Sequence, residues 1–223
     1  YTNESLCQHF KTKSLKGFGI DGLPNGLVAS GAILHYLVET QHHKLQHINS
    51  IQRLLEADFV WMDKFTIRNL ELYHSNNSNA VTLIQVIDKT LSPMGGRLLK
   101  RWLALPLKSV AAIKARHDVV QYFYENETAL MEIQSSLKGV GDLERLISKV
   151  ATAKVSPREV VQLKNSLEQI LPIKALALDC DHLHLNSLGK KIHDCEALRL
   201  KIKATLNDDA PVNILKGHTI ASS

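Results

Sequence analysis

Cysteine, aromatic side chains and long apolar runs are all scarce in this 223-residue chain. Its three cysteines are too few, and odd in number, for a disulfide framework, so we expect a reducing compartment and a cytoplasmic protein. Aromatic residues make up 5% of the chain, and alternating strand patterns are rare, which disfavours a β-sandwich. The apolar runs are too short and too often interrupted to cross a membrane.

The ends of the chain also lack familiar signals. The first five residues, YTNES, are polar and acidic, without the basic start and apolar stretch of a secretory signal. Because the chain begins without Met and ends without a structural stop, we expect a piece of a longer protein. Its 44% hydrophobic and 22% charged residues exclude disorder as a description of the whole chain. The net charge of +5 favours an ordinary solvated surface over a nucleic-acid-binding one.

Helical periodicity dominates from about residue 24 onward. Apolar residues predict a first helix with one face formed by Leu27, Leu34, Leu37 and Val38. Later helices are marked at their starts by a cap followed by proline at Ser92, by Ser109, and by a capping box in residues 156–159 (SPRE). Residues 179–189 are expected to form a loop, followed by a last helix over 192–206. The fold class is therefore predicted to be mainly α, a helical bundle or array.

Two glycine patterns suggest nucleotide binding but lack its context. Residues 17–22 (GFGIDG) match G-x-G-x-x-G, yet the charged segment before them does not read as the buried strand that a dinucleotide site needs. Residues 26–31 have phosphate-loop glycine spacing without the following Lys-Ser/Thr. An inter-domain turn is the favoured interpretation, with a nucleotide-cofactor enzyme domain using Gly17 to Gly22 as the alternative.

A second candidate site contains ligand types that zinc prefers. They are Cys180, His182, His184, His193 and Cys195. Zinc needs four converging donors, and Cys195 is expected among apolar helix positions, so a core cysteine with surface histidines is favoured. We predict no metal site from this cluster.

The third candidate is a basic group around Trp102, formed by Arg97, Lys100, Arg101 and Lys108. On a helix the first three basic residues share one side, while Met94, Leu98 and Trp102 are expected to turn toward the core. A solvated basic face over a core tryptophan is favoured, and a docking surface for phosphates or an acidic partner is the alternative.

Several separated segments, in order, resemble the core domain of the MutS family of DNA mismatch-recognition ATPases. They are residues 62–72 (MDKFTIRNLEL), 82–88 (TLIQVID), 92–103 (SPMGGRLLKRWL) with 105–107 (LPL), 141–146 (GDLERL) and 156–159 (SPRE). The resemblance covers nearly the whole chain. It implies that 1–22 is the frayed end of an α/β connector domain, 23–50 a connecting helix and loop, 51–209 the helical core domain, and 210–223 a segment leading toward a clamp.

The resemblance implies a parent protein that forms dimers, binds mispaired bases in duplex DNA, uses ATP and Mg²⁺, and signals to downstream repair proteins. Its mismatch-reading and phosphate-binding residues would lie on domains outside this chain, so no catalytic, cofactor or metal residue is carried over. The expected role here is mechanical, joining DNA-binding parts to the ATPase. The residues expected to form that rigid body are Pro93, Met94, Gly95, Arg97, Trp102, Pro106, Asp142, Glu144 and Arg145.

Two points stay open at this stage. Asp142, Glu144 and Arg145 are compatible either with a charge-assisted hydrogen-bond network at the edge of the body or with simple helix capping and solvation. The chain is also compatible with an independent helical scaffold that binds other proteins.

Overall fold

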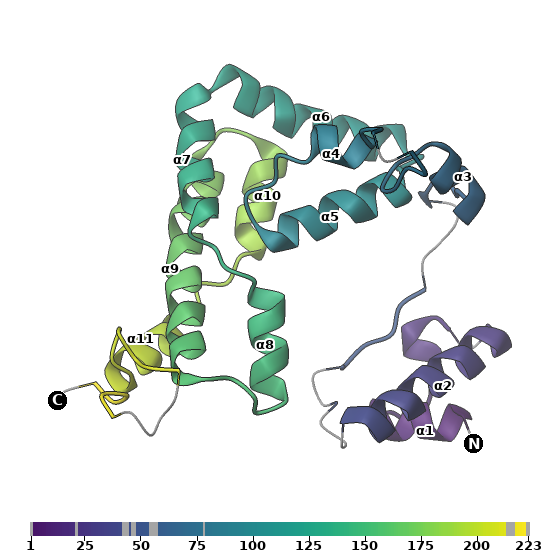
Figure 1. Ribbon diagram of the computed structural model, residues 1–223, viewed down its shortest axis with the longest axis horizontal. Coiled ribbons are helices and arrows are strands. Elements are labelled where there is room, and N and C mark those ends of the chain that lie inside the picture. The colour runs from purple at the N-terminus through teal and green to yellow at the C-terminus, as the bar shows by residue number, and fades with distance from the viewer. Residues whose placement is uncertain are drawn as a thin grey trace. The chain divides into compact units, whose positions relative to one another are not determined.

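A computed structural model describes residues 2–20, 22–41, 45, 48–53, 58–77, 79–212 and 217–221. The chain divides into two compact units, the first made of Tyr1–Leu55 with Ile147–Val155 and the second of Glu56–Leu146 with Ser156–Ser223. Helices make up both units (Figure 1). Within the described residues, β pairing is confined to two isolated bridges, Phe59 with Leu107 and Leu206 with Ile220. The predicted mainly α fold is confirmed.

The first part of the first unit comprises α1 (Thr2–His9), the 3₁₀ turn η1 (Lys16–Phe18) and α2 (Pro24–Gln41), and the unit also includes the end of α8 (Leu143–Ala151). Leu6 of α1 is 1% exposed and shares one apolar core with Leu15, Ile20 and Leu34. A buried leucine thus anchors α1 against α2, a helix and a contact that the sequence pattern does not predict.

Residues on both sides of position 22 contribute to this core. The division of the chain into four segments at 22, 50 and 209 stays a prediction. In the loop expected before residue 50, residues 42–44, 46 and 47 lie outside the described part of the chain, as does Asp21 of the glycine pattern.

The second unit is built around α9, its longest helix. Its helices are α3 (Lys64–Asn69), α4 (Leu83–Ile87), α5 (Pro93–Ala104), α6 (Val110–Glu125), α7 (Glu127–Lys138), α9 (Pro157–Asp179), α10 (Leu183–Lys191) and α11 (Glu196–Thr205); α8 (Leu143–Ala151) begins here and crosses the division between the units. α7, α10 and α11 all pack against α9 (Figure 1). Buried side chains of α9, including Val161, Leu163 and Ala177, form the centre of this packing.

The predicted helix starts are confirmed by their hydrogen bonds. The Ser156 hydroxyl accepts from the Glu159 amide, and the Glu159 carboxylate accepts from the Ser156 amide at 3.0 Å, which completes the capping box. The Ser109 hydroxyl likewise accepts from the Ala112 amide at the start of α6. Each bond satisfies an amide that the first helical turn leaves without a partner.

The loop expected over residues 179–189 was wrong. α10 occupies most of it, capped by the His182 ring, whose Nδ1 accepts from the Leu185 amide at 3.3 Å. Glycine is favoured at position 189 of this helix, because a Cβ there would stand 3.0 Å from the side chain of Ala177. The last helix also begins later than expected, because Cys195 adopts a left-handed backbone with φ of 47° just before it.

Lys164 is a charged residue in the middle of this apolar packing. Its side chain is 6% exposed, and its Nζ donates to the carboxylate of the solvent-exposed Asp208 at 2.6 Å. The bond to Lys164 lowers the pKa of Asp208. A buried ammonium remains tolerable only while an acceptor compensates it, so this pair closes α9 against the segment after α11.

Replacing Asp208 is expected to destabilise the chain more than replacing Lys164 does. Asp208→Ala leaves a buried ammonium without an acceptor. Lys164→Met fills the same space with an apolar side chain, and should either lower the free energy of unfolding by less than about 1 kcal/mol or raise it. The double variant should match Lys164→Met. Urea unfolding measures all three, with Asp209→Ala as the neighbouring acidic control. Equal effects of the Asp208 and Asp209 variants would contradict this account of the pair.

Candidate functional site: a three-residue ionic clamp

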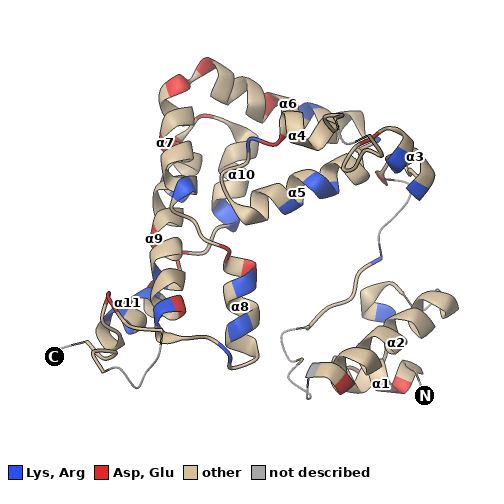
Figure 2. Ribbon diagram, viewed as in Figure 1, with Lys and Arg blue, Asp and Glu red and all other residues tan. Residues whose placement is uncertain are grey.

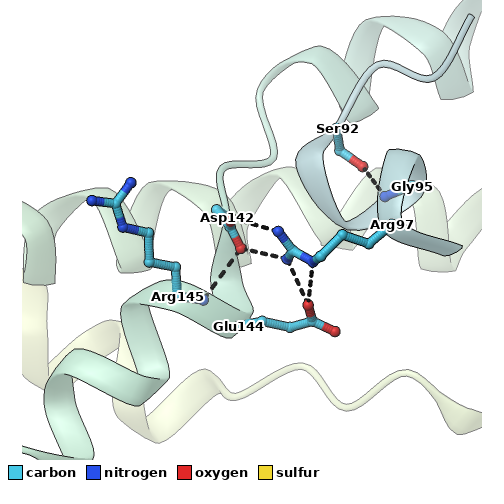
Figure 3. Close-up of polar contacts among 6 residues, drawn as sticks. All are labelled: Ser92, Gly95, Arg97, Asp142, Glu144 and Arg145. Atoms are coloured by element: carbon cyan, nitrogen blue, oxygen red, sulfur yellow. Dashed lines mark hydrogen bonds and ion pairs between the residues drawn. The ribbon is translucent and has the colours of Figure 1, made fainter. Parts of the chain in front are cut away.

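The first side of the site is the N-terminal turn of α5. The Ser92 hydroxyl accepts from the Gly95 amide at 3.2 Å, and Pro93 occupies the first turn, where its missing N–H costs nothing (Figure 3). Met94 is half-buried in the same turn. This fixed helix start determines where Arg97, one turn further on, projects.

The second side is the turn between α7 and α8, which is fastened to α9. The Gly141 amide donates to the Ser166 hydroxyl at 3.0 Å, and that hydroxyl donates to the Gln162 carbonyl at 2.9 Å. A Cβ at Gly139 would stand 2.7 Å from the side chain of Gln169, so any other residue there would force that side chain to shift. Asp142 leaves this anchored turn as the residue before α8.

Arg97 joins the two sides. Its Nη1 and Nη2 donate to the two carboxylate oxygens of Asp142 at 2.9 and 2.7 Å. Its Nε and Nη2 donate to Oε2 of Glu144 at 2.9 and 2.5 Å (Figure 3). Two carboxylates from one turn thus grip one guanidinium from a helix 45 and 47 residues earlier in the chain. We call Arg97, Asp142 and Glu144 the ionic clamp.

The electrostatics of the clamp agree with its geometry. The hydrogen bonds from Arg97 hold the pKa of Asp142 at about 2, below its ordinary value of 3.8, and the two carboxylates raise the pKa of Arg97. The Asp142 side chain is 22% exposed, whereas those of Arg97 and Glu144 are 48% and 68% exposed, so water screens the clamp substantially. A planar, bidentate arrangement in a network of several charges is the kind of ion pair that contributes measurably to stability.

Asp142 also caps α8, because its Oδ1 accepts from the Arg145 amide at 3.2 Å. The guanidinium of Arg145 points away from the clamp (Figure 3), so Arg145 bonds to Asp142 through its backbone amide, and its charge helps to lower the pKa of Asp142 from a distance. The two interpretations left open by the sequence therefore both hold for Asp142. The interpretation of Arg97 as part of a solvated basic face was wrong, because its guanidinium is paired with both carboxylates.

The other expected residues lie away from the clamp. Pro106 follows the end of α5, where its carbonyl accepts from the Val60 amide at 2.7 Å beside the Phe59–Leu107 bridge. Trp102 was expected in the core, but its side chain is 41% exposed and lies under the guanidinium of Arg116, whose Cζ is 3.6 Å from the ring centroid. Leu98 is 46% exposed. Helical spacing identifies the apolar side of α5 but not whether anything covers it.

The glycine pattern and the zinc candidates have local structural roles. Gly17 lies in η1 and Gly19 adopts φ of 67° after it; the described residues before them form α1 and a loop, not a strand. His182 caps α10, and His193 Nδ1 accepts from the Cys195 amide at 3.0 Å. In the part of the chain that the structure describes, no three His, Cys, Asp or Glu side chains are grouped to hold a metal ion.

Charge elsewhere on the second unit is spread over several helices. Lys and Arg lie on α3, α5 and α8, and acidic residues mark the corner where α6 meets α7 (Figure 2). None of the described helices is long and apolar enough to span a membrane. Within the clamp, the guanidinium and the two carboxylates are paired to one another.

Sequence reasoning missed the residues that support the clamp. Ser166 lies on a buried face of α9 where an apolar residue would be expected, and a serine at such a position is the signal that a backbone group needs a partner. The approach of Gly139 to Gln169 could have been inferred from the two glycines that flank Val140.

Comparisons with known proteins match both units. The family model described as MutS domain II matches residues 2–49, and the one described as MutS domain III matches residues 65–222. The chain is 60% identical over 222 residues to DNA mismatch repair protein MutS of Flavobacterium psychrophilum, and equally so to MutS of Christiangramia forsetii. It is 49% identical over 217 residues to MutS of Bacteroides thetaiotaomicron. The chain spans 26% of the length of the first two relatives and 25% of the third.

Replacing Trp102 is expected to cost less than replacing a core tryptophan. A half-exposed indole that stacks on Arg116 should contribute about 1 to 2 kcal/mol, against about 3 to 5 kcal/mol for a buried one. The free energy of unfolding of Trp102→Ala, measured in urea, checks this. A loss in the core range would show that the ring is buried in solution.

Acid is expected to remove the contribution of Asp142 to stability. Its pKa is about 2 in the folded chain against an ordinary 3.8, so the unfolded state binds more protons between these values. The contribution is therefore complete above the unfolded pKa and disappears as pH falls through the folded one. Unfolding of the native chain and of Asp142→Asn, which keeps a capping oxygen, is compared at about pH 6, 4 and 3.

The stability gap between these two chains should be widest at the highest pH and shrink steadily toward the lowest. A stability difference that stays constant with pH would mean that the charge of the Asp142 carboxylate does not stabilise the folded chain. The titration of carboxylates away from the clamp is common to both chains and cancels in the comparison.

Proposed function

Because the chain belongs to the MutS family of DNA mismatch repair proteins, we propose that it is the structural core module that couples mismatch binding to the ATPase of its parent protein. The relatives it matches are about four times as long as the chain. Recognition of mispaired duplex DNA, use of ATP and Mg²⁺, dimerisation and signalling to downstream repair proteins are accordingly proposed for the parent, with their chemistry outside these residues.

The ionic clamp is the observation that carries this proposal. Coupling between two distant sites requires an element whose arrangement both sites bias. The clamp ties the start of α5 to the start of α8, and the bond between Gly141 and Ser166 ties that point to α9. A displacement applied to one of these helices is therefore passed to the others through short, charge-assisted bonds, and is not absorbed in a loop.

Residues of the expected body fall into two groups under this proposal. Pro93, Met94 and Gly95 form the helix start that positions Arg97. The guanidinium of Arg97 then binds the carboxylates of Asp142 and Glu144. Pro106 and Trp102 lie at the other end of α5 and hold the connection that follows the helix. No side chain in either group is proposed to touch nucleotide or DNA.

Breaking the clamp in the full-length parent is expected to uncouple its two activities. Arg97→Ala should leave the affinity for a mismatched duplex nearly unchanged, because Arg97 is not proposed to contact DNA. It should reduce, several-fold, the acceleration of nucleotide exchange that a mismatch produces over a matched duplex. Fluorescence anisotropy measures the DNA affinity, and release of a fluorescent ADP analogue measures the exchange.

The matched control is Arg101→Ala, which removes the same charge from an exposed position of the same helix. It should leave both quantities unchanged, and Arg97→Lys should give an intermediate result because an ammonium cannot form the bidentate contact. The proposal is overturned if Arg97→Ala keeps the full mismatch-dependent acceleration, or if it weakens DNA binding and exchange in equal measure.

A further inference from the structure

The buried Lys164 and the anchored turn before α8 both attach to the same stretch of α9. The Gly141 amide bonds to the hydroxyl of Ser166, which is 1% exposed and bonds in turn to the Gln162 carbonyl. Lys164 lies between these two α9 residues in the sequence and bonds to Asp208. A helix turns by about 100° per residue, so the side chains of Lys164 and Ser166 leave α9 on nearly opposite sides. The first half of α9 is therefore held from two sides.

The chain after α11 is fastened on the second of these sides. We call the described residues 207–212 and 217–221 the C-terminal segment. Within it, the Asn207 amide donates to the Thr219 carbonyl at 3.0 Å, next to the bridge that pairs the end of α11 with this segment. The two parts of the C-terminal segment are thus bonded to each other, and Asp208 follows directly on the bond that joins them.

The ion pair between Lys164 and Asp208 fixes position more sharply than an apolar contact does. The Lys164 side chain is 6% exposed, so its ammonium has little access to water and depends on the Asp208 carboxylate, 2.6 Å away. Moving the carboxylate out of hydrogen-bond distance would leave a buried charge unpaired, which costs free energy. Apolar side chains in its place are often as stable, but they let neighbouring segments slide without such a cost. The pair therefore contributes position more than stability.

We propose that Lys164 and Asp208 are positioning residues, which make the C-terminal segment follow the movements of the ionic clamp. A displacement of the clamp reaches α9 through the bond from Gly141 to Ser166, and leaves α9 through the bond from Lys164 to Asp208. Residues 210–223 are expected to lead toward another part of the parent, so the pair passes the displacement onward. This role rests on the proposed coupling of mismatch binding to the ATPase, because it supplies the contact through which that coupling leaves α9.

Nucleotide exchange in the full-length parent carrying Lys164→Met tests this role. Release of a fluorescent ADP analogue is compared on mismatched and matched duplexes, and fluorescence anisotropy measures the DNA affinity. We expect the acceleration by a mismatch to fall several-fold while the DNA affinity stays unchanged. The urea midpoint should be nearly unchanged or higher, because methionine fills the space of the lysine without a buried charge. A loss of coupling without a loss of stability is not expected from a purely structural lysine.

The matched control is Lys174→Met on the same helix. Lys174 also forms an ion pair, with Asp194 before α11, but its side chain is 24% exposed and its partner lies outside the C-terminal segment. This control should keep the full acceleration. If Lys164→Met does not fold, Asp208→Asn takes its place. It alters only an exposed side chain, removes the charge that holds the ammonium, and should also lower the acceleration, though by less.

Combining Lys164→Met with Arg97→Ala separates this role from the coupling proposal. If both residues act along one path, the double variant should lose no more of the acceleration than Arg97→Ala alone. The role of Lys164 is overturned by losses that multiply, by a folded Lys164→Met chain with full acceleration, or by an equal loss from Lys174→Met. In those cases a loss from Arg97→Ala leaves the coupling proposal standing. Full acceleration in Arg97→Ala overturns the coupling proposal, and the role of Lys164 with it.

Discussion

One guanidinium, shared by two carboxylates from a single turn, is the contact that joins the start of α5 to the start of α8. Such a contact is strong only when both carboxylates are presented at the correct spacing, and side-chain entropy opposes that arrangement in a free loop. Here hydrogen bonds that involve the backbone already hold the residues that carry these side chains in place. Gly141 is bonded to Ser166, Asp142 caps α8, and Arg97 leaves a helix start that Ser92 holds in place. The ionic clamp is therefore the last link in a series of fixed backbone positions.

The two ends of α5 serve different purposes. Its first turn is satisfied internally, since Ser92 caps it, Pro93 has no N–H to satisfy, and Arg97 is paired with two carboxylates. Its last turn carries Trp102, which stacks on a guanidinium that has no anionic partner there. One end of α5 is thus fixed by contacts within the described chain, and the other end carries an exposed tryptophan under a guanidinium. The chain belongs to the MutS family, and the relatives that it matches are about four times as long as the chain.

Local chemistry could be predicted from the sequence wherever it depended on near neighbours. The caps at Ser92, Ser109 and Ser156 need only residues three positions away, and all three form as expected. The expectations for residues 179–189 and for Trp102 were wrong for physical reasons, and α1 was not predicted. α1 is stabilised by burial of Leu6 against distant residues, α10 begins with an unusual histidine cap, and periodicity cannot say whether the apolar side of α5 is covered.

The candidate site was only partly accessible from the sequence for the same reason. Asp142, Glu144 and Arg97 were each recognised as important, but their pairing spans more than forty residues and no local pattern encodes it. Ser166 and Arg116 were not recognised, because their roles arise from the packing of separate helices. The family resemblance identified the class of protein without specifying these contacts.

The contact between Lys164 and Asp208 affects the order in which the chain can fold during synthesis. The two residues are 44 positions apart, so α9 leaves the ribosome well before the carboxylate that its ammonium requires. Until then the ammonium must stay hydrated, and the apolar face around it cannot close. We expect the second unit to remain open through most of its translation and to become compact only when the segment beyond α11 has emerged.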